Sequence, residues 1–132
     1  MVERVNIETD KLAQPVGPYA LGVKVKGGTL LFISGCVAFD RDGNIVGQGD
    51  IGAQCRQALA NMKAVLEAAG ATFANVVKIT NYVTNAQDYP KMAPVRAEYL
   101  REPYPASTLV EVRSLLYPEL LVEIEAIAVV EE

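Results

Sequence analysis

The C-terminal part of the chain reads Leu121-Val122-Glu123-Ile124-Glu125-Ala126-Ile127-Ala128-Val129-Val130, an uninterrupted run without Gly or Pro. The run is rich in β-branched residues, which predicts a β-strand. Side chains alternate along a strand, so every second residue shares one face. One face therefore carries only apolar side chains, those of Val122, Ile124, Ala126, Ala128 and Val130. A face of this kind is suited to lie under helices.

The opposite face of this strand carries two carboxylates, Glu123 and Glu125, among large apolar side chains. They are two positions apart along the strand, which corresponds to roughly 7 Å. If the face is covered, these carboxylates lie at or beside a site. If it faces water, they keep a sheet soluble, and the strand pattern taken alone favours this second interpretation.

Bulk composition points to one domain with a covered surface. The chain has 132 residues, a hydrophobic fraction of 51% and a mean hydropathy of +0.18, which is apolar for so short a chain. Such an excess predicts a buried subunit interface. No apolar run reaches the roughly 18 residues of a membrane span. The N-terminus lacks the apolar core of a signal peptide, so we expect a cytoplasmic protein.

Charge and residue types exclude several function classes. The net charge is −4, and Lys and Arg are scattered, which argues against binding to nucleic acid or to an anionic membrane. The sequence contains no histidine, which removes Ser-His-Asp and Cys-His catalysis and His-based metal sites. Its two cysteines, Cys36 and Cys55, are expected to be buried thiols. Proton transfer must then use Glu, Asp, Tyr, Lys or a held water.

Periodicity and turn residues predict six strands and two helices. The Gly27-Gly28 pair predicts a hairpin turn, and residues 29–34 a buried strand. In the second helix Pro90 should lie in the first turn, whereas Pro94 predicts a kink or a restart near Ala93. The expected strands are 2–7, 20–26, 29–34, 76–83, 106–112 and 121–130, and the expected helices are 50–69 and about 86–100.

This order predicts a single α+β domain over residues 1–132, with one mixed six-stranded sheet and two helices on one face. The other face of the sheet would be bare and would include Glu123 and Glu125. A bare and partly apolar face predicts a homo-oligomer.

Four local features have the chemistry to form a site. Gly17-Pro18-Tyr19 is a rigid loop that presents an aromatic ring, and Ser34-Gly35 offers a hydroxyl and a free amide at a strand end. Residues 105–112 open a strand after two prolines, and Glu123 lies on the bare face. None of these features is specific by itself, and Gly-rich phosphate-binding motifs are absent.

Taken together and in order, the motifs resemble the Rid family, the YjgF/YER057c group that includes the RidA enamine/imine deaminases. The resemblance runs over nearly the whole chain. The segments that carry it are Gly17-Pro18-Tyr19, Leu31-Phe32-Ile33-Ser34-Gly35, Gln54-Cys55-Arg56-Gln57-Ala58-Leu59, Asn61-Met62-Lys63, Leu66-Glu67-Ala68-Ala69-Gly70-Ala71, Val76-Val77-Lys78, Tyr104-Pro105-Ala106, Val110-Glu111-Val112 and Val122-Glu123-Ile124-Glu125-Ala126-Ile127-Ala128.

The resemblance implies a chorismate-mutase-like subunit in a homotrimer, whose sheets line an inner barrel with clefts between neighbouring subunits. It implies hydrolysis of reactive enamines and imines, such as 2-aminoacrylate, to a 2-oxo acid and ammonia, with no metal or organic cofactor. By position it assigns the ring over the small-molecule ligand to Tyr19, a hydroxyl and an amide to Ser34 and Gly35, backbone contacts to Leu109, and the residue that orients the attacking water to Glu123.

The sequence departs from the deaminase pattern at one position. The arginine that follows Pro-Ala and grips the substrate carboxylate is here Ser107. Loss of such a clamp costs about 2–5 kcal/mol of binding, so an altered substrate class is expected. Arg96, where the family usually has an Asn, could supply a cation from another direction or be a surface charge, and Arg113 is a further candidate. The other interpretation is a trimeric small-molecule-binding protein without catalysis.

Overall fold

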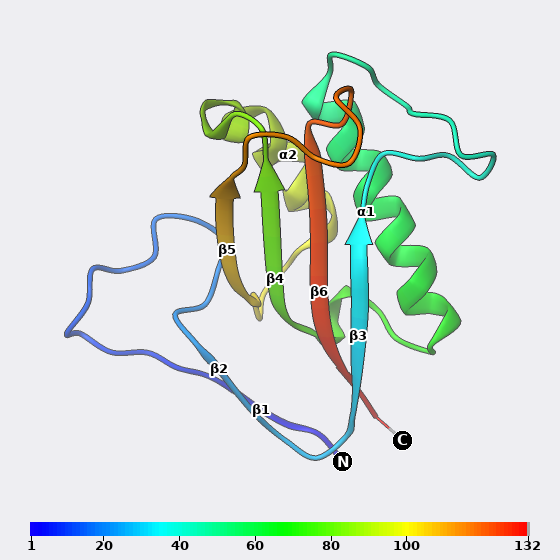
Figure 1. Cartoon of the computed structure of the whole chain (residues 1–132). Coiled ribbons are helices and arrows are strands. Elements are labelled where there is room, and N and C mark those ends of the chain that lie inside the picture. The colour runs from blue at the N-terminus through cyan, green and yellow to red at the C-terminus, as the bar shows by residue number, and fades with distance from the viewer. Residues whose placement is uncertain (132) are drawn as a thin grey trace.

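The computed structural model describes residues 1–131 and contains the six strands and two α-helices that the sequence predicts. Figure 1 shows their arrangement, which confirms the α+β class. The elements are β1 (Glu3–Asn6), β2 (Val23–Lys26), β3 (Thr29–Cys36), α1 (Ile51–Ala68), β4 (Val76–Val83), α2 (Tyr89–Tyr99), β5 (Ala106–Glu111) and β6 (Val122–Val130), with short 3-10 turns η1 (Phe73–Asn75) and η2 (Ala86–Asp88).

The strands form two sheets, where the sequence predicted one. Four strands lie in the order β3-β6-β4-β5, with β4 and β5 parallel and the other pairs antiparallel, while β1 and β2 form a separate antiparallel ribbon. The chain does reverse at Gly27 and Gly28, which have φ of 83° and 78°. The predicted hairpin pairing across this turn is wrong, because β2 pairs with β1 and β3 takes β6 as its partner.

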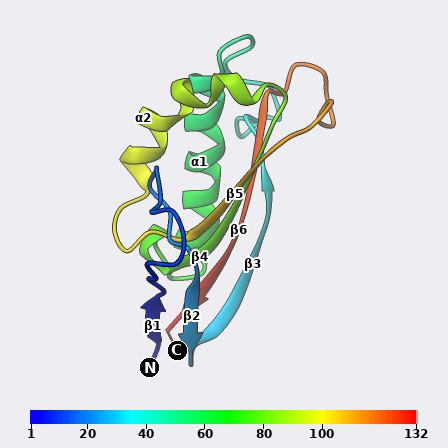
Figure 2. The ribbon, with the colours of Figure 1, turned by 90° about the vertical axis from the view of Figure 1, so that its left-hand side faces the viewer.

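Helix α1 packs its apolar stripe onto the sheet, and both helices lie on one face, as Figure 2 shows. Asp50 caps the helix, since its carboxylate accepts from the backbone N–H of Ala53 at 3.1 Å, and Gly70 with a φ of 74° follows its end. These ends confirm the predicted helix. The core between helix and sheet includes Cys55, Leu59, Met62 and Leu66 from α1, and Val122, Ile124, Ala126 and Ala128 from β6.

Helix α2 runs continuously from Tyr89 to Tyr99, so the predicted restart near Ala93 is wrong. Pro90 lies in the first turn as expected, and the irregular part of the segment is η2, which precedes the helix. Pro94 removes one backbone hydrogen bond, the one to the carbonyl of residue 90, and the helix continues past it. No helix within residues 1–131 has the length and apolar character that a membrane crossing requires.

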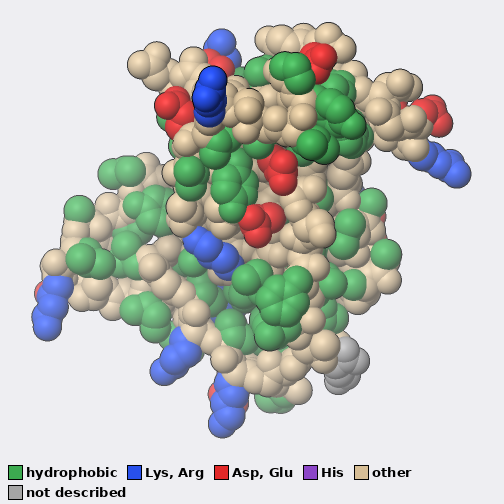
Figure 3. All heavy atoms as spheres, in the orientation of Figure 1, with side chains coloured by type: hydrophobic (Ala, Val, Ile, Leu, Met, Phe, Trp, Pro, Cys, Tyr) green, Lys and Arg blue, Asp and Glu red, His purple; other side chains and the backbone are tan. Residues whose placement is uncertain are grey.

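The second face of the four-stranded sheet is uncovered in the single chain. Strand β3, predicted to be buried, exposes 61% of Leu30 and 70% of Phe32 on this face. Figure 3 shows the face, with acidic side chains near its centre among hydrophobic ones. Glu123 and Glu125 alternate with the buried residues of β6 and belong to this face. The bare face that the sequence predicted is therefore present.

Candidate functional site

The N-terminal loop is fixed against the first residues of β5. The backbone N–H of Ala20 donates to the carbonyl of Pro105 at 3.0 Å, and Ala20 pairs with Ala106 in a parallel bridge. One residue earlier, the N–H of Tyr19 donates to the carbonyl of Gly17 at 2.9 Å and closes a tight turn. This pairing brings the ring of Tyr19 to the β5 edge of the sheet.

A cavity of about 220 Å³ lies where this loop meets β4, β5 and α2. Four residues that the sequence singled out for ligand binding meet in this cavity: Tyr19, Arg96, Ser107 and Leu109. Its other lining residues are Val16, Gly17, Asn81 and Tyr89. We call it the arginine pocket.

Arg96 lies inside this pocket with only 3% of its surface exposed. Its Nη1 donates to the hydroxyl of Tyr89 at 2.8 Å, its Nη2 donates to Ser107 Oγ at 3.4 Å, and its Cζ lies 5.7 Å from the centre of the Tyr89 ring. The interpretation of Arg96 as a surface charge is therefore wrong, because its side chain is buried in the pocket. Arg113 is exposed and does not line the pocket.

Asn81 and Tyr89 line the same pocket and were not singled out from the sequence. Asn81 is 1% exposed, and its amide donates to Ser107 Oγ at 3.3 Å and to the carbonyl of Thr108 at 3.0 Å. Two signals could have found these residues. Asn81 is a polar residue at a core-facing position of β4, and Tyr89 lies two helical turns before Arg96, on the same face of α2.

A second group of predicted site residues lies at the other edge of the sheet. Ile33 pairs with Ala126 and Cys36 with Ile124, so Ser34 and Gly35 form a β-bulge. A Cβ added to Gly35 would lie 1.9 Å from Glu123 Oε2. The carboxylate of Glu123 thus lies directly over the glycine, which makes a side chain at position 35 incompatible with this placement.

The position of Glu123 also affects the pKa of a neighbouring thiol, that of Cys36. Burial, together with the charge of Glu123, raises the pKa of Cys36 to about 11. Both cysteines are free and buried, as the sequence predicted. The other carboxylate of β6, Glu125, accepts from the Tyr82 hydroxyl at 2.6 Å, which raises the pKa of Tyr82. Glu125 is therefore hydrogen-bonded to Tyr82, which lies on the same face of the sheet.

Within one chain these two groups do not meet. Ser107 is paired with the buried Ile79 and faces the helices, whereas Glu123 is paired with Tyr82 and faces the bare side. Ser34 and Gly35 line a separate hollow of about 380 Å³ beside α1.

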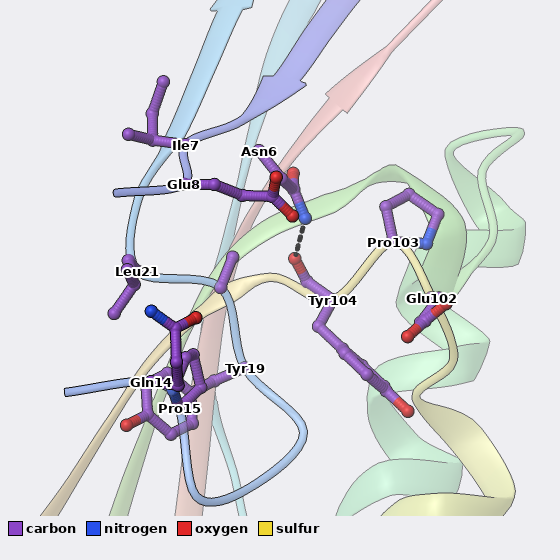
Figure 4. A pocket seen from close by; sticks show the side chains of 11 residues that line it. Asn6, Ile7, Glu8, Gln14, Pro15, Tyr19, Leu21, Glu102, Pro103 and Tyr104 are labelled. Atoms are coloured by element: carbon purple, nitrogen blue, oxygen red, sulfur yellow. Dashed lines mark hydrogen bonds between the residues drawn. The ribbon is translucent and has the colours of Figure 1, made fainter. Parts of the chain in front are cut away.

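A larger cavity of about 540 Å³ lies on the N-terminal side of Tyr19. Figure 4 shows it, with the Asn6 amide donating to the carbonyl of Tyr104 at 2.9 Å. Apart from Tyr19, none of the predicted site residues lines this cavity.

Comparison with known proteins finds a matching family model and several similar proteins. Residues 9–130 match the family model described as Endoribonuclease L-PSP. The chain is 46% identical over 123 residues to a "RutC family protein" of Pyrococcus horikoshii, covering 92% of this chain and 94% of that protein. It is 38% identical over 125 residues to the "2-iminobutanoate/2-iminopropanoate deaminase" of Dermatophagoides farinae, covering 95% of each.

Among solved structures, the fold matches a Rid-family protein of unknown function from Yersinia pestis. The TM-score is 0.86 at 36% identity, and the match covers 96% of this chain and 98% of that one. At this level of identity over nearly the full length, the likeness extends beyond the fold to the family.

Proposed function

This chain belongs to the Rid (YjgF/YER057c/UK114) family, and from that premise we propose that it hydrolyses a small reactive imine or enamine to a carbonyl compound and ammonia. The relative from Dermatophagoides farinae, named for deamination of 2-imino acids, supports the reaction type. The observation that carries the proposal is the position of Glu123 over Gly35, where a half-buried carboxylate lies against the strand bulge that also contains Ser34.

We propose that the site is completed between subunits of a homotrimer. The arginine pocket lies at the β5 edge and Glu123 lies near the β3 edge, which are the two ends of the same four-stranded sheet. In a closed ring of identical subunits, one surface of each subunit meets a different surface of the next, and in this proposal the two surfaces are the β5 edge and the β3 edge. The exposed Leu30 and Phe32 would then be covered inside the assembly.

Glu123 is the proposed general base and acid in this cleft. Its carboxylate accepts a proton from water while the water oxygen bonds to the imine carbon. This proton passes to the imine nitrogen and gives a carbinolamine. A second proton then moves from the new hydroxyl through Glu123 to the amine nitrogen, so that the C–N bond breaks and ammonia leaves as the carbonyl forms. An enamine takes up a proton at carbon first and enters the same sequence as an imine. Tyr19 covers the ligand, and Ser34 and Gly35 border it from the other subunit.

The second candidate is a trimeric binding protein that has kept the cleft without the reaction. Ser107 favours it, because a hydroxyl stands where the resemblance implies a bidentate carboxylate clamp. The two candidates differ in turnover and not in ligand contacts, so an assay of hydrolysis separates them.

The deciding experiment generates 2-aminoacrylate and 2-iminobutanoate in situ with a dehydratase and follows their trapping by semicarbazide. Wild-type protein should reduce semicarbazone formation, and Glu123→Gln should lose about 10²- to 10⁴-fold of that activity. Glu125→Gln is the matched control, since it lies two residues away on the same face and should retain activity. Trapping that wild-type protein leaves unchanged would favour the binding protein.

A further inference from the structure

The arginine pocket contains a buried cation without an anion. Arg96 is 3% exposed, and a guanidinium keeps its charge at physiological pH. Within residues 1–131 the structure has two side-chain ion pairs, Arg56 with Glu98 and Lys91 with Asp88, and neither includes Arg96. A buried and uncompensated charge destabilises a fold strongly, so its presence at a cavity indicates an anionic ligand.

The same cavity holds unused hydrogen-bonding groups. A guanidinium has five N–H donors, and among residues 1–131 Arg96 donates only to Tyr89 and Ser107 and its Nε has no partner. Asn81 Oδ1, in a side chain that is 1% exposed, also has no partner in this part of the chain. Both residues line the arginine pocket. Both atoms are buried, each with less than 1 Å² accessible, so a small side-chain movement is needed to bring them to the cavity. A ligand that presents an anionic acceptor to Arg96 and a donor to Asn81 would then satisfy both residues.

We infer that Arg96 and Asn81 bind the carboxylate and the adjacent N–H of a small 2-imino acid, so that Arg96 serves as the carboxylate clamp from helix α2. The inference rests on the proposed function for its identification of the ligand as a substrate. The carboxylate accepts from the free donors of Arg96, and the imine nitrogen donates to Asn81 Oδ1. The cavity of about 220 Å³ has the volume of roughly seven waters, which suits a short aliphatic acid.

Binding of the product analogue 2-oxobutanoate, measured by calorimetry, tests the clamp independently of turnover. Arg96→Met should weaken binding about 30-fold or more, as expected for loss of a buried charge-assisted pair. Arg41→Gln, which removes an exposed positive charge in the loop before α1, should leave binding within twofold of wild type. The neutral ketone 2-butanone should not distinguish wild type from Arg96→Met.

Two further variants extend the test, and the first of them retains Arg96 and so remains informative if Arg96→Met folds poorly. Ser107→Asp places a carboxylate where Ser107 Oγ now lies 3.4 Å from Arg96 Nη2, so it should neutralise the cation and weaken 2-oxobutanoate binding to the same extent. Ser107→Arg, added to Arg96→Met, returns a cation to the pocket and should restore binding to within about tenfold of wild type.

The outcomes separate this inference from the proposed function. Binding by Arg96→Met or Ser107→Asp within threefold of wild type overturns the clamp. So does a loss of the oligomer in Arg96→Met without a change in affinity per folded subunit, since the anion would then be a carboxylate of the neighbouring chain. Arg96-dependent binding without imine hydrolysis would retain the clamp and reject the enzyme. Hydrolysis of 2-imino acids that is unchanged in Arg96→Met would retain the enzyme and reject the clamp.

Discussion

Gly35 is the residue whose role is most sharply defined by geometry. Its φ is ordinary, so backbone conformation does not demand a glycine here. The demand comes from Glu123, whose Oε2, Cδ and Cγ would lie 1.9, 2.7 and 2.9 Å from an added Cβ. A glycine at the bulge therefore gives the carboxylate its place, and the pair behaves as one unit.

Gly35→Ala should therefore impair activity much more than stability. The methyl group forces Glu123 into another rotamer, and a displacement of about 1 Å in a catalytic group reduces turnover on the order of 10²-fold. The free energy of unfolding should fall by only about 1 kcal/mol, because the displaced group is a side chain that can move. Imine hydrolysis and urea unfolding of the same preparation check both values. Full activity in Gly35→Ala would contradict the position assigned to Glu123.

Replacement of Arg96 should likewise impair function without lowering stability. Replacing an unpaired buried charge by an apolar side chain of similar length is neutral or stabilising, by about 1–4 kcal/mol. Arg96→Met should accordingly keep or raise the free energy of unfolding while it loses 2-oxobutanoate binding. Thermal and urea unfolding without ligand provide the measurement. A destabilisation of more than about 2 kcal/mol would show that Arg96 supports the fold through Tyr89 and Ser107.

Part of this proposed site could be predicted from the sequence. Tyr19, Ser107 and Leu109 could be named because short, ordered motifs carry them. The burial of Arg96 could not be settled, because helix α2 has no clear apolar stripe that would place one residue inside and another outside. Asn81 was missed because strand alternation alone does not separate a core position that lines a cavity from one that packs against a helix.

At the scale of elements, the alternating sequence pattern of β6 predicted correctly which side chains lie on each face of the strand. It lies between β3 and β4, so its apolar face is buried under the helices while Glu123 and Glu125 point the other way. The partner of β2 was harder to predict from the sequence. The turn residues Gly27 and Gly28 look the same whether or not β3 pairs with β2. The competing partner β6 lies about a hundred residues further along the chain.

Arg4 fastens the β1–β2 ribbon to the rest of the fold. Its Nη1 donates to the carbonyls of Ala74 and Val76, and its Nη2 donates to those of Pro103 and Tyr104. Its Nε donates to Asn6 Oδ1 at 3.2 Å, and partial burial lowers the pKa of Arg4. One side chain thus connects three segments that are distant in sequence.

Arg4→Lys should lower the free energy of unfolding by about 2–4 kcal/mol, because an ammonium has three donors and cannot reach all of these acceptors. The midpoint of urea unfolding measures this change. Arg41→Lys serves as the control, since Arg41 is exposed and its replacement should change stability by less than about 0.5 kcal/mol. Equal midpoints for the two variants would contradict the fastening role.

Two buried thiols, Cys36 on β3 and Cys55 on α1, make the stability of the fold depend on pH. Burial raises the pKa of Cys36 and of Cys55 from the ordinary 9.0 to about 11. Above pH 9 the unfolded chain releases thiol protons that the folded chain retains, so the unfolded state is favoured as pH rises. Below pH 9 both states hold these protons, and the thiols make no pH-dependent contribution.

We therefore expect the free energy of unfolding to fall between pH 9 and 11, by up to about 2 kcal/mol for each thiol. Urea unfolding at pH 8, 9, 10 and 11 measures the slope. The Cys36→Ala, Cys55→Ala double variant should be less stable at pH 8 but should lose less stability over this range. A slope that the double variant leaves unchanged would assign the effect to other groups, such as Tyr82.

At the scale of the whole molecule, the proposed site residues form two groups, one at the β5 edge of the sheet and one around the bulge where β3 meets β6. The fold class, the helices on one face and the bare second face could be predicted from sequence, since each follows from periodicity and composition. The separation of the two groups could not be predicted, because it depends on strand order. The order β3-β6-β4-β5 places Ser107 on the edge strand β5 and Glu123 two strands away on β6, and the pairings with Ile79 and Tyr82 place them on opposite faces.

The shared cleft is tested most directly by mixing two inactive variants, Glu123→Gln and Arg96→Met, by co-expression. Each alone should form a particle of three 14.2 kDa chains by light scattering, with little hydrolysis of 2-iminobutanoate. In mixed trimers, sites whose two halves come from different subunits are intact in about one case in four, so roughly a quarter of wild-type activity should return. Mixed particles that remain as inactive as either parent would contradict a site built from two subunits.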